Sequence, residues 1–282
     1  MSAAILVAAV GGGILLIVSE CFPLEESDTV ASGKTVIVTG ANSGIGKAVA
    51  GKLNKLQGFV MKVTFQSAQW CAVQHAETVT CVHSHLVFEQ KVEVLIYNAG
   101  IYQCPYTKTE EGFEMQLGFN HLGHFLLAHL VLDLLKLSSP SRVVVVSSNL
   151  YKYGSINFQR PQQVESSCNK AFCYSQSKLA NLLFNRELNQ RLEDEGVTGV
   201  TVNTLTPGIV RTSLGRHIYI PLHGKTSLLP GLAGLLQEPT GGLVGKCFAN
   251  CEEEELMPKV MDDHAFKRLW DLSESMVGIK SQ

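Results

Sequence analysis

Tyr174 and Lys178 are the pair of side chains in this sequence with the clearest capacity for chemistry. They stand four residues apart, so on a helix they share one face. A lysine ammonium beside a phenol favours the phenolate, and we expect it to lower a pKa that starts near about 10. A tyrosine in that setting can move a proton on and off an alcohol near neutral pH. The pair therefore predicts a redox enzyme that acts on an alcohol.

A glycine-rich turn lies upstream of this pair, in Thr-Gly-Ala-Asn-Ser-Gly-Ile-Gly at residues 39–46. It follows a β-branched run at residues 34–39 that predicts a buried parallel strand, and residues 45–56 continue at helical spacing. A strand, a glycine turn and a helix bring backbone N–H groups to a pyrophosphate. The spacing Gly-x-x-x-Gly-x-Gly differs from the usual dinucleotide motif, so the turn alone is a weak signal and its context strengthens it.

Further apolar runs predict the rest of a sheet. These runs are residues 59–65, 93–97, 142–147 and 200–205. Helical patterns alternate with them, which predicts a single α/β domain with a doubly wound parallel sheet of the Rossmann type. Ligands of such a sheet bind at the carboxyl ends of its strands. Every motif named so far falls at such an end or on the adjoining helix.

Three long helices are predicted besides the one after the glycine turn. Residues 115–137 are apolar but carry Asn120, three histidines and Asp133, which indicates a buried helix of the domain and not a membrane span. A helix that begins after Cys173 and runs to about residue 193 carries Tyr174 and Lys178. The apolar side chains of a C-terminal amphipathic helix are expected to cover the core; they are Phe266, Leu269, Trp270 and Met276.

Composition excludes several classes of protein. The 282 residues are 45% hydrophobic, enough for one large domain, and the formal net charge of −2 with scattered Lys and Arg argues against a nucleic-acid partner. Eight cysteines without a Cys-x-x-Cys pair indicate free thiols in a reducing compartment. No metal site is predicted: His83 and His85, like His121 and His124, lack further ligands nearby, and the latter two are expected to pack or hydrogen-bond. The acidic run at residues 252–255 is expected to be a solvated loop or helix start.

The N-terminus predicts a membrane anchor. Residues 3–18 form an uncharged apolar run near the lower end of membrane-spanning length. No basic segment or small-residue cleavage site accompanies it, which favours an uncleaved anchor over a signal peptide. The predicted organisation is an anchor at 1–22, a linker at 23–33 and an enzyme domain at 34–282. Membrane lipid is then a partner, at the endoplasmic reticulum or alternatively a mitochondrial membrane.

The motifs together resemble those of the short-chain dehydrogenase/reductase family, and within it the membrane-anchored retinol dehydrogenases. The resemblance rests on the glycine turn, Tyr97-Asn98-Ala99-Gly100, residues 119–125, Val146-Ser147-Ser148, Tyr174-x-x-x-Lys178 and residues 207–212. It is dense from residue 93 to 216 and returns from 242 to 279. It implies hydride transfer between NADP(H) and a retinoid alcohol or aldehyde, or a similar lipophilic compound. Helix pairing into homo-oligomers is common in this family.

The resemblance also implies a role for each site residue. Tyr174 is the general acid/base, Lys178 holds the nicotinamide ribose and lowers the Tyr174 pKa, and Asn120 holds a water in the proton relay. Ser148, in preference to Ser147, donates to the substrate oxygen. The apolar loop after Thr212 lines the substrate pocket. The implied cofactor contacts are Gly40, Asn42, Ser43, Gly44, Ile45, Gly46, Asn98, Ala99, Gly100, Lys178, Pro207, Gly208, Val210 and Thr212.

Two stretches depart from the family pattern. Residues 59–76 contain no acidic residue that could clamp the ribose of NAD, and Lys62 is the only Lys or Arg there. If residues 78–83 form the next strand, too few residues precede residue 93 for a full βαβ crossover. A second shortened stretch is 217–241. Two hypotheses follow: an active NADP(H)-dependent retinol/retinal oxidoreductase, or a catalytically silent membrane-tethered relative, either a splice product or a decayed copy.

Overall fold

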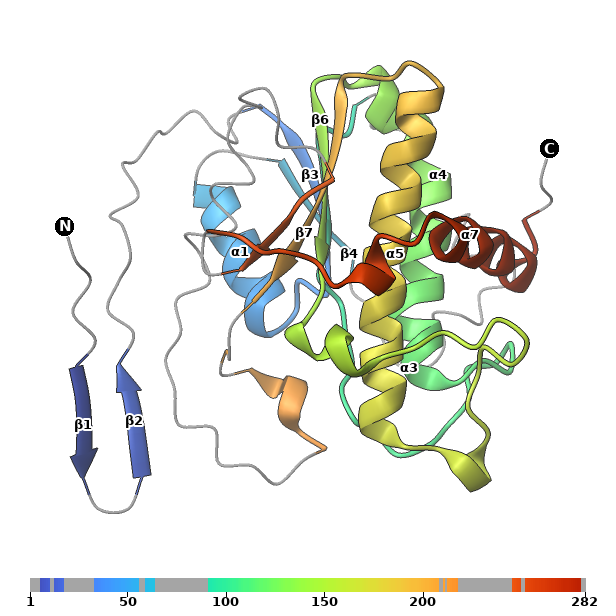
Figure 1. Ribbon diagram of the computed structural model, residues 1–282. Coiled ribbons are helices and arrows are strands. Elements are labelled where there is room, and N and C mark those ends of the chain that lie inside the picture. The colour runs from blue at the N-terminus through green and yellow to red at the C-terminus, as the bar shows by residue number, and fades with distance from the viewer. Residues whose placement is uncertain are drawn as a thin grey trace.

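A seven-stranded sheet in the order β4-β3-β5-β6-β7-β8-β9 forms the centre of the molecule (Figure 1). The computed structural model describes residues 6–10, 13–17, 33–55, 59–63, 91–207, 210, 212–217, 245–249 and 252–279. Six of the strands run parallel and β9 is antiparallel to β8. The predicted parallel α/β sheet is therefore confirmed.

Most strands lie where the β-branched runs predict them. They are β3 (Thr35–Thr39), β4 (Phe59–Val63), β5 (Val94–Tyr97), β6 (Ser141–Val146), β7 (Val200–Thr206), β8 (Cys247–Ala249) and β9 (Glu252–Glu253). The expectation for residues 252–255 is wrong at Glu252 and Glu253, because these pair with Ala249 and Phe248 of β8. These two residues form a strand because they pair with β8, and the local run of charges does not indicate that pairing.

Helices cover both faces of the sheet (Figure 1). The long ones are α1 (Gly44–Lys55), α4 (Gly123–Leu137), α5 (Lys170–Asp194) and α7 (Asp263–Val277). The single turn α3 (Met115–Leu117) and a π turn (Gly118–Leu122) run into α4, so the helix predicted over 115–137 is confirmed with one irregular turn. Helix α5 begins at Lys170, before the start predicted after Cys173, because the Asn169 side chain accepts hydrogen bonds from the N–H groups of Ala171 and Phe172.

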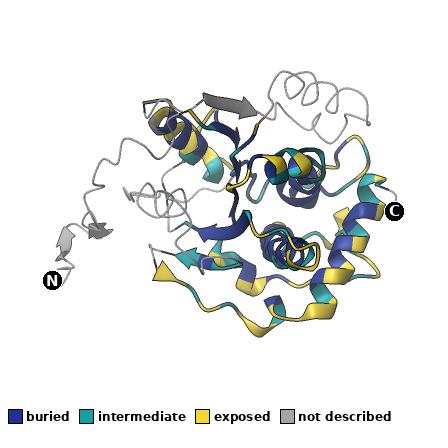
Figure 2. Ribbon diagram, turned by 90° about the horizontal axis from the view of Figure 1, so that it is seen from above, coloured by how far each residue is buried: buried dark blue, intermediate teal, exposed yellow. Residues whose placement is uncertain are grey.

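Alternation along the strands divides the core between the two faces. Ile37, Leu95 and Val143 point toward α4 and α5, and the next residues along those strands point toward α1. Both faces are buried, which explains the nearly continuous apolar runs (Figure 2). Phe266, Leu269 and Trp270 of α7 are buried as predicted, and α7 packs against α5. Because β3, β5, β6 and β7 are parallel neighbours, their carboxyl ends lie together at one end of the sheet.

The N-terminal strands β1 (Leu6–Val10) and β2 (Gly13–Ile17) pair antiparallel within the stretch where the sequence predicts an anchor. In the described part of the chain, no helix has the length and apolar character needed to cross a bilayer. The anchor stays a prediction. Residues 18–32, 64–90 and 218–244 lie outside the described residues, and with them most of the predicted linker, the predicted strand at 78–83, His83 and His85.

Candidate active site

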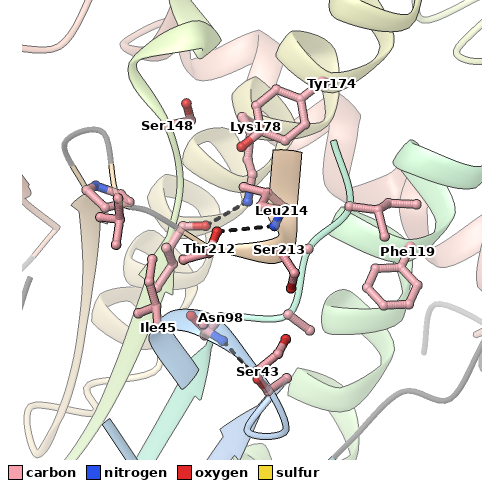
Figure 3. Close-up of a pocket in the computed structure, with 18 of the residues that line it drawn as sticks. Ser43, Ile45, Asn98, Phe119, Ser148, Tyr174, Lys178, Thr212, Ser213 and Leu214 are labelled. Atoms are coloured by element: carbon pink, nitrogen blue, oxygen red, sulfur yellow. Dashed lines mark hydrogen bonds between the residues drawn. The ribbon is translucent and has the colours of Figure 1, made fainter. Parts of the chain in front are cut away.

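A cavity of about 250 Å³ lies at the carboxyl ends of the parallel strands. Its lining comes from the turns after β3 and β5, the end of β6, helix α5 and the segment after β7. Figure 3 shows Ser148, Tyr174 and Lys178 at one end of this cavity and Ser43 and Asn98 at the other. The fold thus gathers the chemically active side chains and the glycine turn around one space, as the sequence predicts for a sheet of this type.

The glycine turn touches the turn after β5 so closely that side chains cannot fit between them. Gly40 has a φ of +68°, and a Cβ there would lie 2.8 Å from the Ala99 Cα. A Cβ on Gly46 would lie 2.4 Å from both Asn98 Nδ2 and the Gly40 carbonyl oxygen. The turn therefore needs glycine at both positions, and it leaves the N-terminus of α1 open to the cavity.

Thr39, the last residue of β3, holds these two turns together. Its Oγ1 accepts hydrogen bonds from the backbone N–H groups of Asn98 and Ala99, both at 2.9 Å. The Asn98 side chain returns a hydrogen bond from Nδ2 to the Thr39 carbonyl oxygen at 2.9 Å. Asn98 is thereby fixed at the cavity wall by contacts with the protein itself.

His124 links this pair of turns to the π turn. Its Nδ1 lies 3.0 Å from the Asn120 carbonyl oxygen, an acceptor, so Nδ1 carries the proton of the neutral ring. Nε2, 2.9 Å from Thr39 Oγ1, is then the acceptor for the threonine hydroxyl. Burial lowers the pKa of His124 to about 3, which keeps the ring neutral. His121 is likewise buried, with Ser273 Oγ at 2.9 Å, so the prediction that both histidines pack and hydrogen-bond is confirmed.

Tyr174 and Lys178 both line the cavity from α5, and the expected effect of the lysine on the phenol is wrong for this structure. Burial raises the pKa of Tyr174 to about 12; a hydrogen bond with the Ser148 side chain lowers it, and Tyr102 raises it. Lys178 Nζ donates to the Val146 carbonyl oxygen at 3.0 Å and lies 5.7 Å from the Tyr174 ring centroid. Burial also lowers the pKa of Lys178 to about 8. Burial is the largest cause of both shifts, and it favours the protonated phenol at neutral pH.

The two serines at the end of β6 have different surroundings. Ser147 is buried and its hydroxyl donates to the Lys178 carbonyl oxygen at 3.0 Å, which ties β6 to α5. Ser148 is half-buried, and its Oγ accepts from the Leu150 N–H at 3.3 Å. The Ser148 hydroxyl proton can therefore be donated toward the cavity. The contacts favour Ser148 over Ser147 as a donor to a bound molecule.

Asn120 lies behind the cavity and does not line it. Its Oδ1 accepts from the Ile101 N–H at 2.8 Å, and its Nδ2 donates to the Ile101 carbonyl oxygen at 3.0 Å and to Ser177 Oγ at 2.9 Å. A Cβ added to Gly100 would lie 3.6 Å from Asn120 Oδ1 and 3.8 Å from Lys178 Nζ, so both side chains end close to Gly100. The observed role of the Asn120 side chain is to join the β5 turn to α5; a water at this residue stays a prediction.

Most of the cofactor contacts implied by the sequence meet at the cavity. Gly46 lies beneath the turn, Gly208 is outside the described residues, and the other implied contacts line the cavity. The structure adds lining residues that sequence reasoning missed: Ile101, Phe119, Val146, Ser147, Ser213, Leu214 and Arg216. All of them lie within the family-like motifs, next to Gly100 or just after Thr212, so their positions in the sequence could have indicated them.

Tyr102 is another residue that the sequence did not single out. Its ring packs edge-on against Tyr174 with centroids 4.5 Å apart. The next residue, Gln103, has a φ of +48°, and its side chain donates to the Tyr102 hydroxyl at 2.9 Å. A backbone in the left-handed region costs energy for a residue with a side chain, so contacts such as that of the Gln103 N–H with Gln116 Oε1 at 2.8 Å must hold it. The loop positions Tyr102 against the phenol.

Comparison with known proteins decides the family. The family model of the short chain dehydrogenases matches residues 63–220, more than half of the chain. Retinol dehydrogenase 14 of Mus musculus is 46% identical over 293 residues, covering 88% of this chain and 86% of that protein. The protein is a short-chain dehydrogenase. Members of this family use NAD or NADP as hydride carriers.

Solved structures agree with the fold of this short-chain dehydrogenase. A protein of Mycobacterium paratuberculosis superposes with a TM-score of 0.68 at 28% identity, over 88% of this chain and 94% of that one. A short chain dehydrogenase of Escherichia coli CFT073, solved in complex with NADPH, has a TM-score of 0.61 at 17% identity, over 79% and 98% of the two chains. At 17% identity, the similarity to the Escherichia coli structure shows a shared fold and nothing further.

The site fits a dinucleotide on its own geometry. Glycine at positions 40 and 46 lets the turns after β3 and β5 pack directly together. The backbone of residues 40–44 then forms a cradle on the cavity wall that a ligand can approach. The first turn of α1 carries no acidic residue, which suits a phosphate at its N-terminus. The cavity continues from this cradle to Tyr174 and Lys178.

Proposed function

We propose that this short-chain dehydrogenase interconverts retinal and retinol, or a similar lipophilic carbonyl and alcohol, with NADP(H) as the hydride carrier. The observation that carries the proposal is the meeting of Tyr174, Ser148 and Lys178 at the far end of the cavity from the glycine turn. The 46% identity with retinol dehydrogenase 14 supports the substrate class.

The chain's own residues would hold the dinucleotide along the cavity. The Gly40 to Gly44 turn and the N-terminus of α1 suit its pyrophosphate, and Asn98, Lys178 and Thr212 line the path toward Tyr174. When bound, the cofactor donates or accepts the hydride. The absence of any acidic residue in 59–76 supports NADP(H) over NAD(H), because the acidic ribose clamp of NAD sites is missing.

Protein groups supply the proton chemistry. Because the pKa of Tyr174 is about 12, the phenol carries its proton at neutral pH and can donate it to a carbonyl oxygen. The Ser148 hydroxyl can donate a second hydrogen bond and stabilise negative charge as it develops on that oxygen. Lys178, with a pKa of about 8, can exchange a proton close to physiological pH. The protonation state of Tyr174 favours carbonyl reduction as the direction to assay first.

Apolar side chains support a lipophilic substrate. Ile101, Phe119, Val210 and Leu214 contribute to the cavity lining beside the polar groups. A retinoid partitions into lipid, and the predicted N-terminal anchor would hold the enzyme at that source, with the endoplasmic reticulum the proposed location. Membrane vesicles containing the full-length protein are therefore the suitable preparation for assay.

Substitution of the phenol tests the reaction. Tyr174→Phe is expected to lower the rate of NADPH-dependent retinal reduction by about 10²–10⁴-fold, because the proton donor is lost while the ring is kept. NADPH binding, measured by fluorescence titration, should be retained. Tyr153→Phe is the matched control, since Tyr153 is 75% exposed and should leave the rate unchanged. Retinal reduction that survives in Tyr174→Phe would refute the assignment.

A dehydrogenase fold without activity is the second candidate. One supporting observation is the edge of the sheet, where β4 has β3 as its only neighbour among the described strands. The other is that too few residues separate the strand predicted at 78–83 from residue 93 for the full βαβ crossover of the family pattern. Titration with NADPH and separately with NADH separates the candidates. Saturable binding together with retinal turnover would exclude the silent protein, whereas a folded protein that binds neither dinucleotide would support it.

A further inference from the structure

Two thiols face each other at the start of α5. The Sγ atoms of Cys168 and Cys173 lie 3.5 Å apart. Asn169 between them caps the helix, so Cys168 stands just before the cap and Cys173 is the fourth residue of α5. Side chains at these two positions pack against each other across a helix start, because the cap fixes the angle at which the chain enters. The contact is therefore built into the local fold and does not depend on a distant element.

The two thiols differ in their access to solvent. Cys173 is 1% exposed, whereas Cys168 is half-buried. Burial and the nearby Glu114 carboxylate raise the pKa of the Cys173 thiol, so it is a poor nucleophile on its own. Cys168 is the sulfur that an oxidant in solution reaches first. A second sulfur within hydrogen-bonding distance can then resolve the oxidised product before it is oxidised further.

We propose that Cys168 and Cys173 form a reversible disulfide when the protein meets a hydroperoxide. The Cys168 thiol gives up its proton, and its thiolate attacks the peroxide. The O–O bond breaks, Cys168 becomes a sulfenic acid, and the leaving oxygen takes up a proton and departs as water or an alcohol. The Cys173 sulfur then attacks the sulfenic sulfur, the S–S bond forms and the S–O bond breaks. The departing hydroxide takes the thiol proton and leaves as water. Two thiols are thereby oxidised by two electrons, and one hydroperoxide is reduced.

Disulfide formation would act on the candidate active site through the chain. The two sulfurs must approach from 3.5 Å to about 2.05 Å, which requires the first turn of α5 to adjust. Tyr174 directly follows Cys173 and lines the cavity. A shift of the first turn of α5 therefore also displaces the Tyr174 phenol. Loss of retinal reduction on oxidation rests on the proposed function; formation of the bond does not.

Differential alkylation of the full-length protein tests the proposal. The reduced protein is treated with hydrogen peroxide, free thiols are alkylated, and peptides are mapped by mass spectrometry. We expect the Cys168 and Cys173 thiols to be lost together, a peptide joined by both residues to appear, and dithiothreitol to restore both thiols. Retinal reduction should fall on oxidation and recover on reduction.

Two variants sharpen the test. Cys168→Ser should leave basal activity unchanged, prevent the linked peptide and protect activity from peroxide. Cys104→Ser removes a buried thiol from the same region and should behave like the wild type. Cys168 and Cys173 thiols that stay alkylatable in peroxide, or that are lost without a linked peptide, would overturn the proposal. The peptide map gives this result even where no retinal reduction is found, so the two proposals fail separately.

Discussion

Two fully buried tyrosines differ in what their hydroxyl groups contact. The Tyr97 hydroxyl is buried without a hydrogen-bond partner among the described residues, between α4 and α5. The Tyr151 hydroxyl accepts a hydrogen bond from the Met257 N–H at 3.3 Å. A buried polar group without a partner costs about 1–3 kcal/mol, so the Tyr97 hydroxyl opposes folding.

Tyr97→Phe is therefore expected to stabilise the protein by about 1 kcal/mol, which corresponds to a rise in melting temperature of roughly 2–4 °C. Tyr151→Phe is the control, and it should lower stability by a similar amount because it leaves the Met257 N–H without its acceptor. Thermal unfolding of the two variants measures both effects. A Tyr97→Phe protein less stable than the wild type would mean that the hydroxyl has a partner in the folded state.

Individual residues also show where sequence reasoning stops. The types and spacing of Tyr174, Lys178 and Ser148 were enough to predict that they meet. The direction of the Tyr174 pKa was not predictable, because it depends on burial by residues distant in sequence, such as Tyr102. The hydrogen bonds of the Asn120 side chain to Ile101 and Ser177 were not predictable either, because they depend on how the π turn faces α5.

Helix α1 illustrates how glycines of one element have opposite effects. A Cβ at Gly46 would overlap the Gly40 carbonyl oxygen and Asn98 Nδ2, both at 2.4 Å, whereas a Cβ at the exposed Gly51 would meet no atom within 4 Å. One glycine is needed for the contact between two turns. The other only adds flexibility to the unfolded chain and weakens the helix.

Gly46→Ala is expected to destabilise the protein by about 1–3 kcal/mol, because backbone must move to relieve the overlap. It should also weaken NADPH binding at least about tenfold, or 1.4 kcal/mol, by distorting the cradle. Gly51→Ala should stabilise the helix by roughly 0.5–1 kcal/mol and leave NADPH binding unchanged. Thermal unfolding and fluorescence titration of both variants check the pair. Equal effects of the two substitutions would contradict the close contact at Gly46.

At the scale of elements, local patterns predicted β3 to β7 and the long helices, because apolar periodicity is a property of the segment itself. The short strands β8 and β9 were missed, since three and two residues carry no period of their own. Pairing with a neighbouring strand decides them, β8 with β7 and β9 with β8. The π turn was missed because one irregular turn leaves the apolar content of residues 115–137 unchanged. Its effect is nevertheless to place Asn120 and His124 against the β3 and β5 turns.

The molecule as a whole buries several ionisable groups, and this makes its stability depend on pH. Burial lowers the pKa of His121 to about 4 and that of His124 to about 3. Between those values and 6.5 the unfolded chain binds protons that the folded protein excludes, so stability falls as pH decreases through this window. Burial also lowers the pKa of His129, which acts in the same direction. Glu114 and Glu187, whose pKa values burial raises, oppose the trend at the acidic end.

We expect the free energy of unfolding to decrease by roughly 2–3 kcal/mol between pH 7 and pH 5.5, about 1.4 kcal/mol per unit for each histidine once the pH is well below 6.5. Urea unfolding followed by tryptophan fluorescence at several pH values measures the slope. His264→Asn should keep the slope, because His264 is exposed. A stability that stays constant over this range would show that His121 and His124 are already charged in the folded protein.

The last strand of the sheet has a consequence for how copies of the molecule meet. Strand β9 has only two residues, Glu252 and Glu253, and both are exposed at the edge beyond β8. An open edge normally invites a strand from another chain, but a short edge with like charges makes such an addition costly. Two molecules that approached through this edge would bring four carboxylates together, and the Lys246 ammonium 2.6 Å from Glu253 on each molecule would offset only part of their repulsion. At high protein concentration, where copies collide often, this acidic border protects the end of the sheet from misassembly.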